Sequence, residues 1–329
     1  MKKKIFKHVK KYLPLLGIII LLYIIYSLDF EKIKTAFLSV QPLFVLLALS
    51  LTLPRMLIRN AAWQMIQKEQ KININYWKSL KILFIGFFYC SITPGYIGHL
   101  MRIPYMKEET KQPYGKLFIN VFLEVMIRAF SLYIMVTIGL LLVLDLSYQM
   151  INILTTWVIW ILIVIIILLF FIKKERGEKL LLILVKYLIP TKFKKDTKNF
   201  FETFYSDFPR MRKLIAPFLL GAITWVVVFS QEYLYVLSLG LNIPYFYFLL
   251  LFPLANVAGF IPITVGGLGV REAAGILIFT TLFAVSKEEI LVVSLLGFLT
   301  VEVFTGLIGF FLSLTDTVKM GKNDIKPSF

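Results

Sequence analysis

The chain has 329 residues, of which 59% are hydrophobic and only 17% are charged, and its formal net charge is +17. This composition excludes a water-soluble globular domain and is typical of a helical protein that crosses the membrane several times. The basic residues lie in segments that alternate along the chain, which argues against a nucleic-acid-binding surface. A single cysteine, Cys90, and two histidines, His8 and His99, exclude an internal disulfide and a thiolate or histidine-built metal site, so we expect no cofactor.

The apolar runs predict an all-α polytopic membrane protein with about six full transmembrane helices. The first run follows a basic N-terminus without a small-residue cleavage site, so we interpret it as an uncleaved span. Arg55 follows Pro54 near the end of the second span, and we interpret it as an anchor that reaches the headgroups. The predicted full spans are residues 13–28, 42–58, 117–144, 150–172, 214–239 and 289–314.

Two further apolar stretches, 80–106 and 246–284, are interrupted by proline and glycine. The first contains "SITPGYIGHLMRIPYMK" and the second contains "IPITVGGLGVREAAG". Irregular backbone at membrane depth persists only where it is buried in protein or lines a wet cavity. We therefore expect two re-entrant helical hairpins, each entering and leaving on one side. The alternative is two ordinary kinked helices whose glycines serve helix packing.

With two hairpins, 30 of the 36 Lys and Arg residues fall on one side of the membrane together with both termini. The positive-inside rule makes this side the cytoplasm, and we expect a multi-pass protein of the cell membrane. The order span, span, hairpin, span then occurs twice in opposite orientation. This predicts one transmembrane domain, 1–329, with inverted pseudo-repeats at about 1–145 and 150–316. Breaks at corresponding positions of two such halves point to the substrate site of a transporter.

The segment 173–213 holds twelve basic and five acidic residues with apolar residues interspersed. This pattern predicts an amphipathic cytoplasmic segment attracted to anionic lipids. A solvated cytoplasmic linker is the alternative.

The second break predicts an anion-binding site. Its glycines allow a tight turn, and a helix that resumes at Ala273 directs unpaired N–H groups and a positive dipole end toward a cavity. Together with Arg271, these groups suit a phosphate. Consecutive helical residues point about 100° apart, so we expect Arg271 and Glu272 to have separate partners rather than to pair with each other. A self-satisfied charge pair is the alternative.

The first break has similar features. Pro94 and Gly95 end one arm, and Gly98 allows close approach of the backbone. His99 has a side chain that changes charge near neutral pH, or else it anchors at headgroup level. Arg102 either binds substrate or extends to a lipid phosphate at the rim.

Besides Arg55, four charged residues lie well inside the full spans. Glu124 and Arg128 are four residues apart on one helical face, close enough to pair, either as part of the transport mechanism or as a structural pair. Glu232 and Glu302 have no local partner, and we expect both to face the bundle interior. Glu302 is placed to pair with Arg271 or Arg128 across the bundle.

The two breaks resemble the paired signatures of a flippase-like membrane family that includes the N-terminal membrane domain of lysylphosphatidylglycerol synthase. The resemblance covers essentially the full chain. It implies about eight membrane segments with re-entrant elements and a lipid-translocating role. As the substrate-binding set it implies Pro94, Gly95, Gly98 and Arg102 from the first motif, and Gly266, Gly267, Gly269, Arg271 and Glu272 from the second.

The chain departs from the family pattern at several positions. His99 stands where an acid is usual, and Val265 stands where a proline is usual. Glu124 is followed by Val125 instead of an arginine, and Arg128 stands where an aspartate is frequent. These changes rearrange the buried charges, so we expect a headgroup preference different from that of relatives.

The leading hypothesis is a flippase-like transporter of a phosphate-bearing lipid or lipid-linked intermediate, with anionic or polyprenyl-phosphate-linked lipids as partners. Glu124, Glu272 and Glu302 are candidates for proton coupling or charge compensation. One alternative is the membrane subunit of an aminoacyl or glycosyl transferase for lipid headgroups, with a separately encoded partner and His99 as its acid or base. Another is a scaffold that holds a lipid to assemble envelope enzymes. We expect no enzymatic activity, because no catalytic motif is present and no hydrophilic transferase domain follows Phe329.

Overall fold

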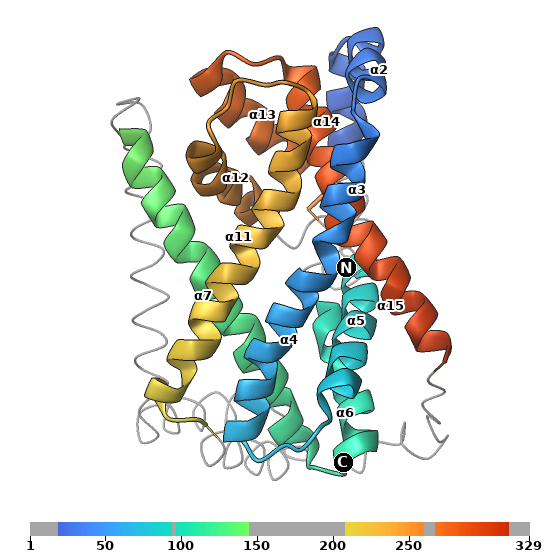
Figure 1. The fold of residues 1–329 in the computed structure, drawn as a ribbon, viewed down its shortest axis with the longest axis vertical. Coiled ribbons are helices and arrows are strands. Elements are labelled where there is room, and N and C mark those ends of the chain that lie inside the picture. The colour runs from blue at the N-terminus through green and yellow to red at the C-terminus, as the bar shows by residue number, and fades with distance from the viewer. Residues whose placement is uncertain (1–18, 94–96, 145–207, 260–266, 316–329) are drawn as a thin grey trace, which may run out of the picture.

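The computed structural model describes residues 19–93, 97–144, 208–259 and 267–315, and all regular structure in these residues is helical (Figure 1). Four helices are long and apolar enough to cross a membrane, and they confirm four of the six predicted full spans. These helices are Pro42–Glu69, Tyr114–Leu141, Met211–Ser238 and Lys287–Leu314.

Parts of the prediction lie outside the described residues. These are the span 150–172, the beginning of the span 13–28 and most of the amphipathic segment 173–213. The described end of the first span, residues 19–27, is helical.

The N-terminal helices form from local capping signals. Helix α2 (Phe30–Leu38) begins at Asp29, whose carboxylate accepts hydrogen bonds from two N–H groups of the first turn. Helix α3 (Pro42–Ser50) begins with a proline, which suits the first turn because its missing N–H has no intrahelical partner there. Helix α4 (Thr52–Glu69) follows after one residue. The resulting 28-residue helix extends beyond the predicted end at residue 58.

The first interrupted stretch divides into short helices. Helix α5 (Tyr76–Ile92) starts at an Asn75 cap and ends before the break. A 3-10 turn, η1 (Ile97–Met101), leads into α6 (Arg102–Thr110), which packs on α5 and on α7 (Tyr114–Leu144). At about 1.5 Å per residue, α5 and α6 are each shorter than the roughly 30 Å hydrocarbon core.

The second interrupted stretch has the same character. Helix α12 (Tyr245–Gly259) and helix α13 (Val270–Phe283) pack on each other, and each is about 22 Å long by the same measure, too short to cross alone. They follow η4 (Met211–Leu214) and α11 (Ile215–Ser238).

The last helix contains an irregular turn in its middle. Helix α14 (Lys287–Phe298) continues through a π-helical segment, η5 (Leu299–Phe304), into α15 (Thr305–Leu314). A π-turn widens the helix locally and often occurs at functional sites.

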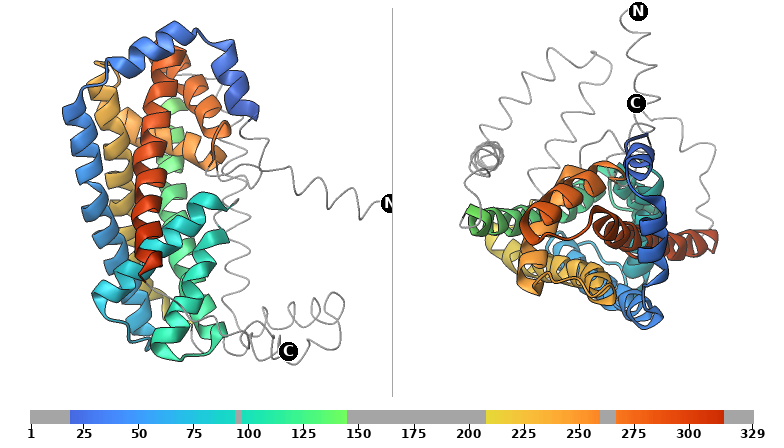
Figure 2. Two further views of the ribbon diagram at one scale, coloured as in Figure 1. Left: turned by 90° about the vertical axis from the view of Figure 1, so that its right-hand side faces the viewer. Right: turned by 90° about the horizontal axis from the view of Figure 1, so that it is seen from above.

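Long-range packing joins the two halves of the chain. Helix α4 packs along α11, and α5 packs along α15, as the two views of Figure 2 show. Figure 1 places α12 and α13 at the end of the bundle that carries α2, and α5 and α6 at the opposite end. The bundle therefore has one interrupted segment at each end, with the long helices between them.

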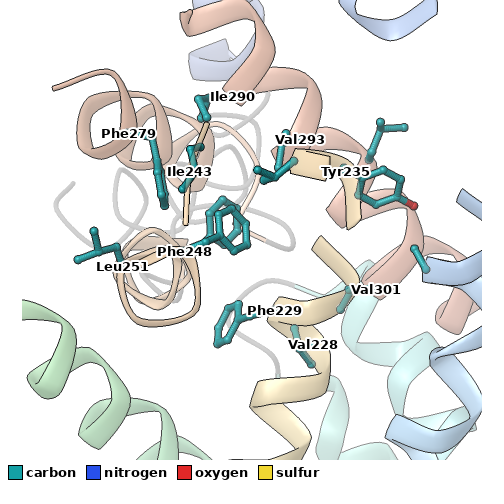
Figure 3. Packing of buried hydrophobic residues seen from close by; sticks show 14 of the residues in the cluster. Val228, Phe229, Tyr235, Ile243, Phe248, Leu251, Phe279, Ile290, Val293 and Val301 are labelled. Atoms are coloured by element: carbon teal, nitrogen blue, oxygen red, sulfur yellow. The ribbon is translucent and has the colours of Figure 1, made fainter. Parts of the chain in front are cut away.

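An aromatic core fills the end formed by α11 to α14 (Figure 3). Phe248 stacks on Phe252 with ring centroids 4.7 Å apart, and Phe279 lies 5.4 Å from Phe248. Buried aromatic pairs of this kind stabilise a fold by about 0.5–1.5 kcal/mol beyond their area burial. The core fixes α12 and α13 against α11.

Candidate functional site

Three arginines converge on one buried glutamate near the first break. Glu124 on α7 is 4% exposed. Its Oε1 accepts from Arg59 Nε at 3.0 Å and its Oε2 accepts from Arg102 Nη2 at 2.7 Å. Arg128 Nε lies 3.8 Å from Oε1, so the predicted pair across one turn of α7 is confirmed. We call Glu124 and its three arginines the first network.

Arg102 is fully buried, so the interpretation that it extends to the lipid at the rim is wrong. Its guanidinium lies over the Trp63 ring at 4.6 Å and its Nε donates to the carbonyl of His99. The short helix α6 folds back on α7 and carries Arg102 into the protein, which the sequence alone did not reveal.

His99 lies inside the first network rather than at headgroup level. Its Nε2 is 3.4 Å from Arg59 Nη2 and 3.3 Å from Arg128 Nη2. A guanidinium only donates, so Nε2 acts as the acceptor in both contacts.

Gly98 fits against the backbone of Tyr89 and Cys90 with no room for a β-carbon, which confirms the predicted close approach. Its N–H donates to Thr93 Oγ1 at 2.9 Å. Pro94 and Gly95 lie outside the described residues.

A second network surrounds the start of α13. Arg271 Nη2 donates to Glu272 Oε1 at 2.8 Å and to the carbonyl of Ser294 at 2.7 Å. Ser294 Oγ donates to the same carboxylate oxygen at 3.0 Å. The expectation that these consecutive residues do not pair is wrong. The reason is that the arginine side chain is long enough to bend around the first turn toward a carboxylate that folds back.

Glu272 folds back because it caps its own helix. Its Oε2 accepts the N–H of Gly269 at 2.5 Å, so the protein's own carboxylate takes this N–H group at the start of α13. Gly267 and Gly269 have φ values of +78° and +85°, which confirms the predicted tight turn. A β-carbon on Gly267 would lie 3.0 Å from the Cα of Gly259. Gly266 lies outside the described residues.

A cavity of about 30 Å³ lies between the two networks. This volume holds roughly two water molecules. His99 from the first break and Arg271 from the second both line it, together with Asn256 of α12. The charged residues that line it are Arg55, Arg59, Arg128, Arg271, Glu232 and Glu302. The candidate residues that do not line it are Gly98, Arg102, Glu124, Gly267, Gly269 and Glu272.

Two arginines of α4 were misplaced by the sequence interpretation. Arg55 is 2% exposed, and its Nη2 donates to Thr305 Oγ1 at 2.5 Å and to the carbonyl of Val301 at 3.3 Å. It is therefore not a headgroup anchor. Arg59 lies just beyond the predicted span 42–58, where a loop was expected, but it is part of the helix and 3% exposed. The signal that could have found both is the spacing of four between Arg55, Arg59 and Trp63, which places them on one helical face.

Glu232 on α11 and Glu302 on η5 face the bundle interior, as predicted, with exposures of 1% and 9%. The Oε2 atom of each has no hydrogen-bond partner in the described part of the chain. In that part, no direct ion pair joins Glu302 to Arg271 or Arg128, so the expected pairing is wrong.

In the residues that the structure describes, four arginines and four glutamates are buried, and Arg128, whose side chain is 17% exposed, adds a fifth, partly buried arginine. The arginines are Arg55, Arg59, Arg102, Arg128 and Arg271, and the glutamates are Glu124, Glu232, Glu272 and Glu302.

Four buried N–H donors of cavity-lining residues have no acceptor among the described residues: Arg55 Nε, Arg128 Nε, Asn256 Nδ2 and, with Nε2 as the acceptor, His99 Nδ1. A buried donor without an acceptor costs about 1–3 kcal/mol, so the cavity favours an anion or another acceptor. Within the described residues, no cluster of three His, Cys, Asp or Glu side chains is suited to a metal ion.

The sequence is similar to known membrane proteins over almost its whole length. The model of the family described as the lysylphosphatidylglycerol synthase TM region matches residues 14–309. The UPF0104 membrane protein PH1989 of Pyrococcus horikoshii is 24% identical over 305 residues, which cover 87% of this chain and 90% of that protein.

Proposed function

The chain belongs to the lysylphosphatidylglycerol synthase TM-region family and is a multi-pass membrane protein, and on this basis we propose that it moves a phosphate-bearing lipid between the two leaflets. The observation that carries the proposal is a cavity with four arginines and only two glutamates in its wall, to which both breaks contribute. The headgroup occupies this cavity while the tails remain in the lipid.

The charge balance favours an anionic substrate. Burying a guanidinium without a counter-ion is costly in an apolar bundle, and with the partly buried Arg128 the described interior holds five arginines against four glutamates. A phosphodiester carries one negative charge, which offsets this surplus. Arginine also recognises phosphate oxygens with strong charge-assisted hydrogen bonds.

Three of the donors that lack an acceptor in the described residues come from three different α-helices. Arg55 lies on α4, Arg128 on α7 and Asn256 on α12, so they approach the cavity from separate directions. A tetrahedral phosphate presents oxygens in several directions and satisfies such an arrangement better than a planar carboxylate does.

The packing of the two halves supports an inverted repeat with pseudo-repeats at about 1–145 and 150–316. If α5 corresponds to α12 and α7 to the last helix, the contact of α5 with α15 matches that of α12 with α7. Both contacts are close because a glycine of one helix lies on a backbone carbonyl of the other. Gly309 lies on Phe84, and Gly139 lies on Leu250. Repeats of this kind allow alternating access around a fixed central site.

In the proposed mechanism, α5–α6 and α12–α13 are re-entrant hairpins that open in turn. The cavity of about 30 Å³ is too small for a headgroup, so the described conformation corresponds to a closed state. The hairpins lie at opposite ends of the bundle (Figure 1). Opening α5–α6 exposes the arginines to one leaflet, and opening α12–α13 exposes them to the other.

The distribution of surface charge supports a cytoplasmic location for the end formed by α5 and α6. This end carries many lysines, including Lys78 in the first turn of α5, which pairs with Glu109 at 2.8 Å. The opposite end carries Lys32, Lys34 and Lys287 next to several acidic residues. Lipid bilayers retain basic loops on the cytoplasmic side, so both termini are proposed to be cytoplasmic in the cell membrane.

Lipid translocation by purified protein tests the proposal. Proteoliposomes with fluorescently labelled phosphatidylglycerol in one leaflet are compared for wild type and Arg55→Gln. Loss of charge-assisted hydrogen bonds of about 1.5–3 kcal/mol predicts roughly a tenfold to hundredfold slower movement. Lys78→Gln removes a charge at the surface and serves as the matched control.

Size-exclusion chromatography and thermal unfolding establish that each variant is folded. The proposal requires that wild type and Lys78→Gln move the lipid at similar rates and that Arg55→Gln does not. If folded wild type moves neither phosphatidylglycerol nor a polyprenyl-phosphate lipid, the transporter assignment is overturned, and a transferase subunit becomes the better explanation.

A further inference from the structure

Two carboxylates in the cavity wall are not explained by anion binding. We propose that Glu232 and Glu302 together form a proton-binding site that is loaded when the anionic headgroup enters. This inference rests on the proposed function, because the headgroup is the partner of the proton. It identifies the ion that accompanies the lipid.

The structure separates these two glutamates from the other two buried ones. Both oxygens of Glu124 accept from arginine, and both oxygens of Glu272 accept from neighbouring donors. In the described residues, Glu232 and Glu302 each retain one buried oxygen without a partner, and both residues line the cavity. A buried acceptor without a donor is unfavourable unless a ligand supplies the donor. The two unpartnered oxygens therefore belong to residues that share one cavity wall.

Local structure holds Glu232 in place. Its side chain lies against Gly297 of α14, where a β-carbon would be 2.8 Å from Cγ and 2.9 Å from Oε1. The absence of a side chain at Gly297 therefore makes room for this carboxylate between α11 and α14.

Glu302 is presented by the π-helical segment η5 rather than by a regular turn. One helical turn beyond Glu232, the hydroxyl of Tyr235 forms a short hydrogen bond with Thr300 of η5. Val228 and Tyr235 of α11 and Val301 of η5 belong to the same buried cluster (Figure 3). Packing thus holds the two elements together and keeps both carboxylates in the wall of one cavity.

A proton suits this pair better than a metal cation does. Hard metal cations require about six oxygen ligands, and four arginines in the same cavity wall repel them. A proton needs only one carboxylate oxygen. In the loading step, hydronium in the cavity transfers its proton to one carboxylate, which forms a carboxyl group and leaves water. The new O–H is then a donor for a water or headgroup oxygen in the cavity.

Other charged and titratable groups face the pair, and all of them bear on its pH dependence. The arginines supply fixed positive charge, whereas His99 is the group that could produce a similar pH response. These groups are Arg55 and Arg59 on α4, Cys90 on α5, His99 on η1, Arg128 on α7, Tyr235 on α11 and Arg271 on α13.

Proton and headgroup bind cooperatively in this arrangement. A phosphate held by the arginines adds negative charge close to the carboxylates, and protonation of a carboxylate removes negative charge near the phosphate. Each ligand therefore increases the affinity for the other by the same factor. Lipid movement becomes faster at lower pH and carries protons in the same direction.

The test measures lipid movement and luminal pH together. Proteoliposomes contain labelled phosphatidylglycerol and a pH-sensitive dye, and the buffer pH is varied around neutrality. For wild type we expect a rate that falls with rising pH by up to about tenfold per pH unit, the limit for one proton, together with proton flux. Glu232→Gln and Glu302→Gln mimic the neutral carboxyl, and we expect lipid movement with a flat pH response and no proton flux.

Two control variants make the outcome specific. Glu31→Gln removes an exposed carboxylate that pairs with Lys34, and we expect its rate of lipid movement to depend on pH as that of wild type does. If the glutamates are the proton site, His99→Gln retains the dependence of the lipid-movement rate on pH. The inference is overturned if this pH dependence persists in both glutamate variants, or if a sodium gradient drives lipid movement.

Failure of the two proposals can be distinguished. If wild type moves no lipid at any pH, the proposed function is wrong. If the glutamate variants move lipid with the same pH dependence as wild type, only the proton-site proposal is wrong. Infrared difference spectra of wild type give a second readout that does not require transport. Adding phosphatidylglycerol vesicles should produce a protonated carboxyl band that is absent in Glu232→Gln, and no such band in wild type contradicts the inference.

Discussion

The two networks beside the breaks combine arginine and glutamate in different proportions. In the first, three guanidiniums share the single carboxylate of Glu124. In the second, Arg271 and Glu272 pair one to one, and Ser294 bonds to both. The first network retains positive charge that an anion can use, whereas the second is a balanced pair at the start of α13. The comparison shows that an arginine in a conspicuous motif need not be the one that binds substrate.

The largest predicted effect is on the first network. Glu124→Gln leaves three guanidiniums without a counter-ion and should destabilise the fold by about 3–5 kcal/mol, as removal of one partner from a buried ion pair does. Thermal unfolding of the purified protein measures it. The double substitution with Arg59→Gln should recover part of the loss, and a double variant less stable than Glu124→Gln would contradict the network.

The second network should respond differently to paired substitution. Arg271→Gln or Glu272→Gln alone leaves one buried charge unpaired, and each should cost about 3 kcal/mol. The double substitution leaves no unpaired charge, so it should be less destabilising than the sum of the two, by about 1–3 kcal/mol. Unfolding measurements on the four proteins form the cycle. Strict additivity would mean that the two side chains do not interact.

The turn before α13 should tolerate substitution less than a glycine turn elsewhere. Gly267→Ala combines a positive φ with a β-carbon 3.0 Å from Gly259, and it should cost about 2–3 kcal/mol. Gly240 has a φ of +65° but open space around it, so Gly240→Ala should cost only about 1 kcal/mol. Equal effects in thermal unfolding would show that the close approach to Gly259 is unimportant.

The smallest effect is expected at the surface. Lys78 and Glu109 form an exposed ion pair at 2.8 Å, and Lys78→Gln should change the free energy of unfolding by no more than about 1 kcal/mol. Added salt should reduce even this difference. If Lys78→Gln lowered the free energy of unfolding as much as Glu124→Gln does, the contrast between buried networks and surface pairs would be contradicted.

Much of the fold could be predicted from the sequence because the membrane imposes simple local rules. The length of an apolar run shows whether a helix can cross, and four predicted spans are found in the structure. Glycines at Gly98, Gly267 and Gly269 indicated close approaches and turns, which the backbone confirms. The helix α4 extends further than predicted because Arg59, a charge that looks like a loop residue, is neutralised inside the protein.

The sequence by itself determined that the chain is an α-helical membrane protein with two interrupted segments, because hydropathy and glycine act locally. Only the tertiary structure decided which charges meet. Arg59 and Glu124 are 65 residues apart, and Arg55 contacts Thr305 across 250 residues. Such pairs depend on how helices from different parts of the chain pack. The same packing places Glu232 and Glu302 in the wall of a common cavity, each with one oxygen that has no partner among the described residues.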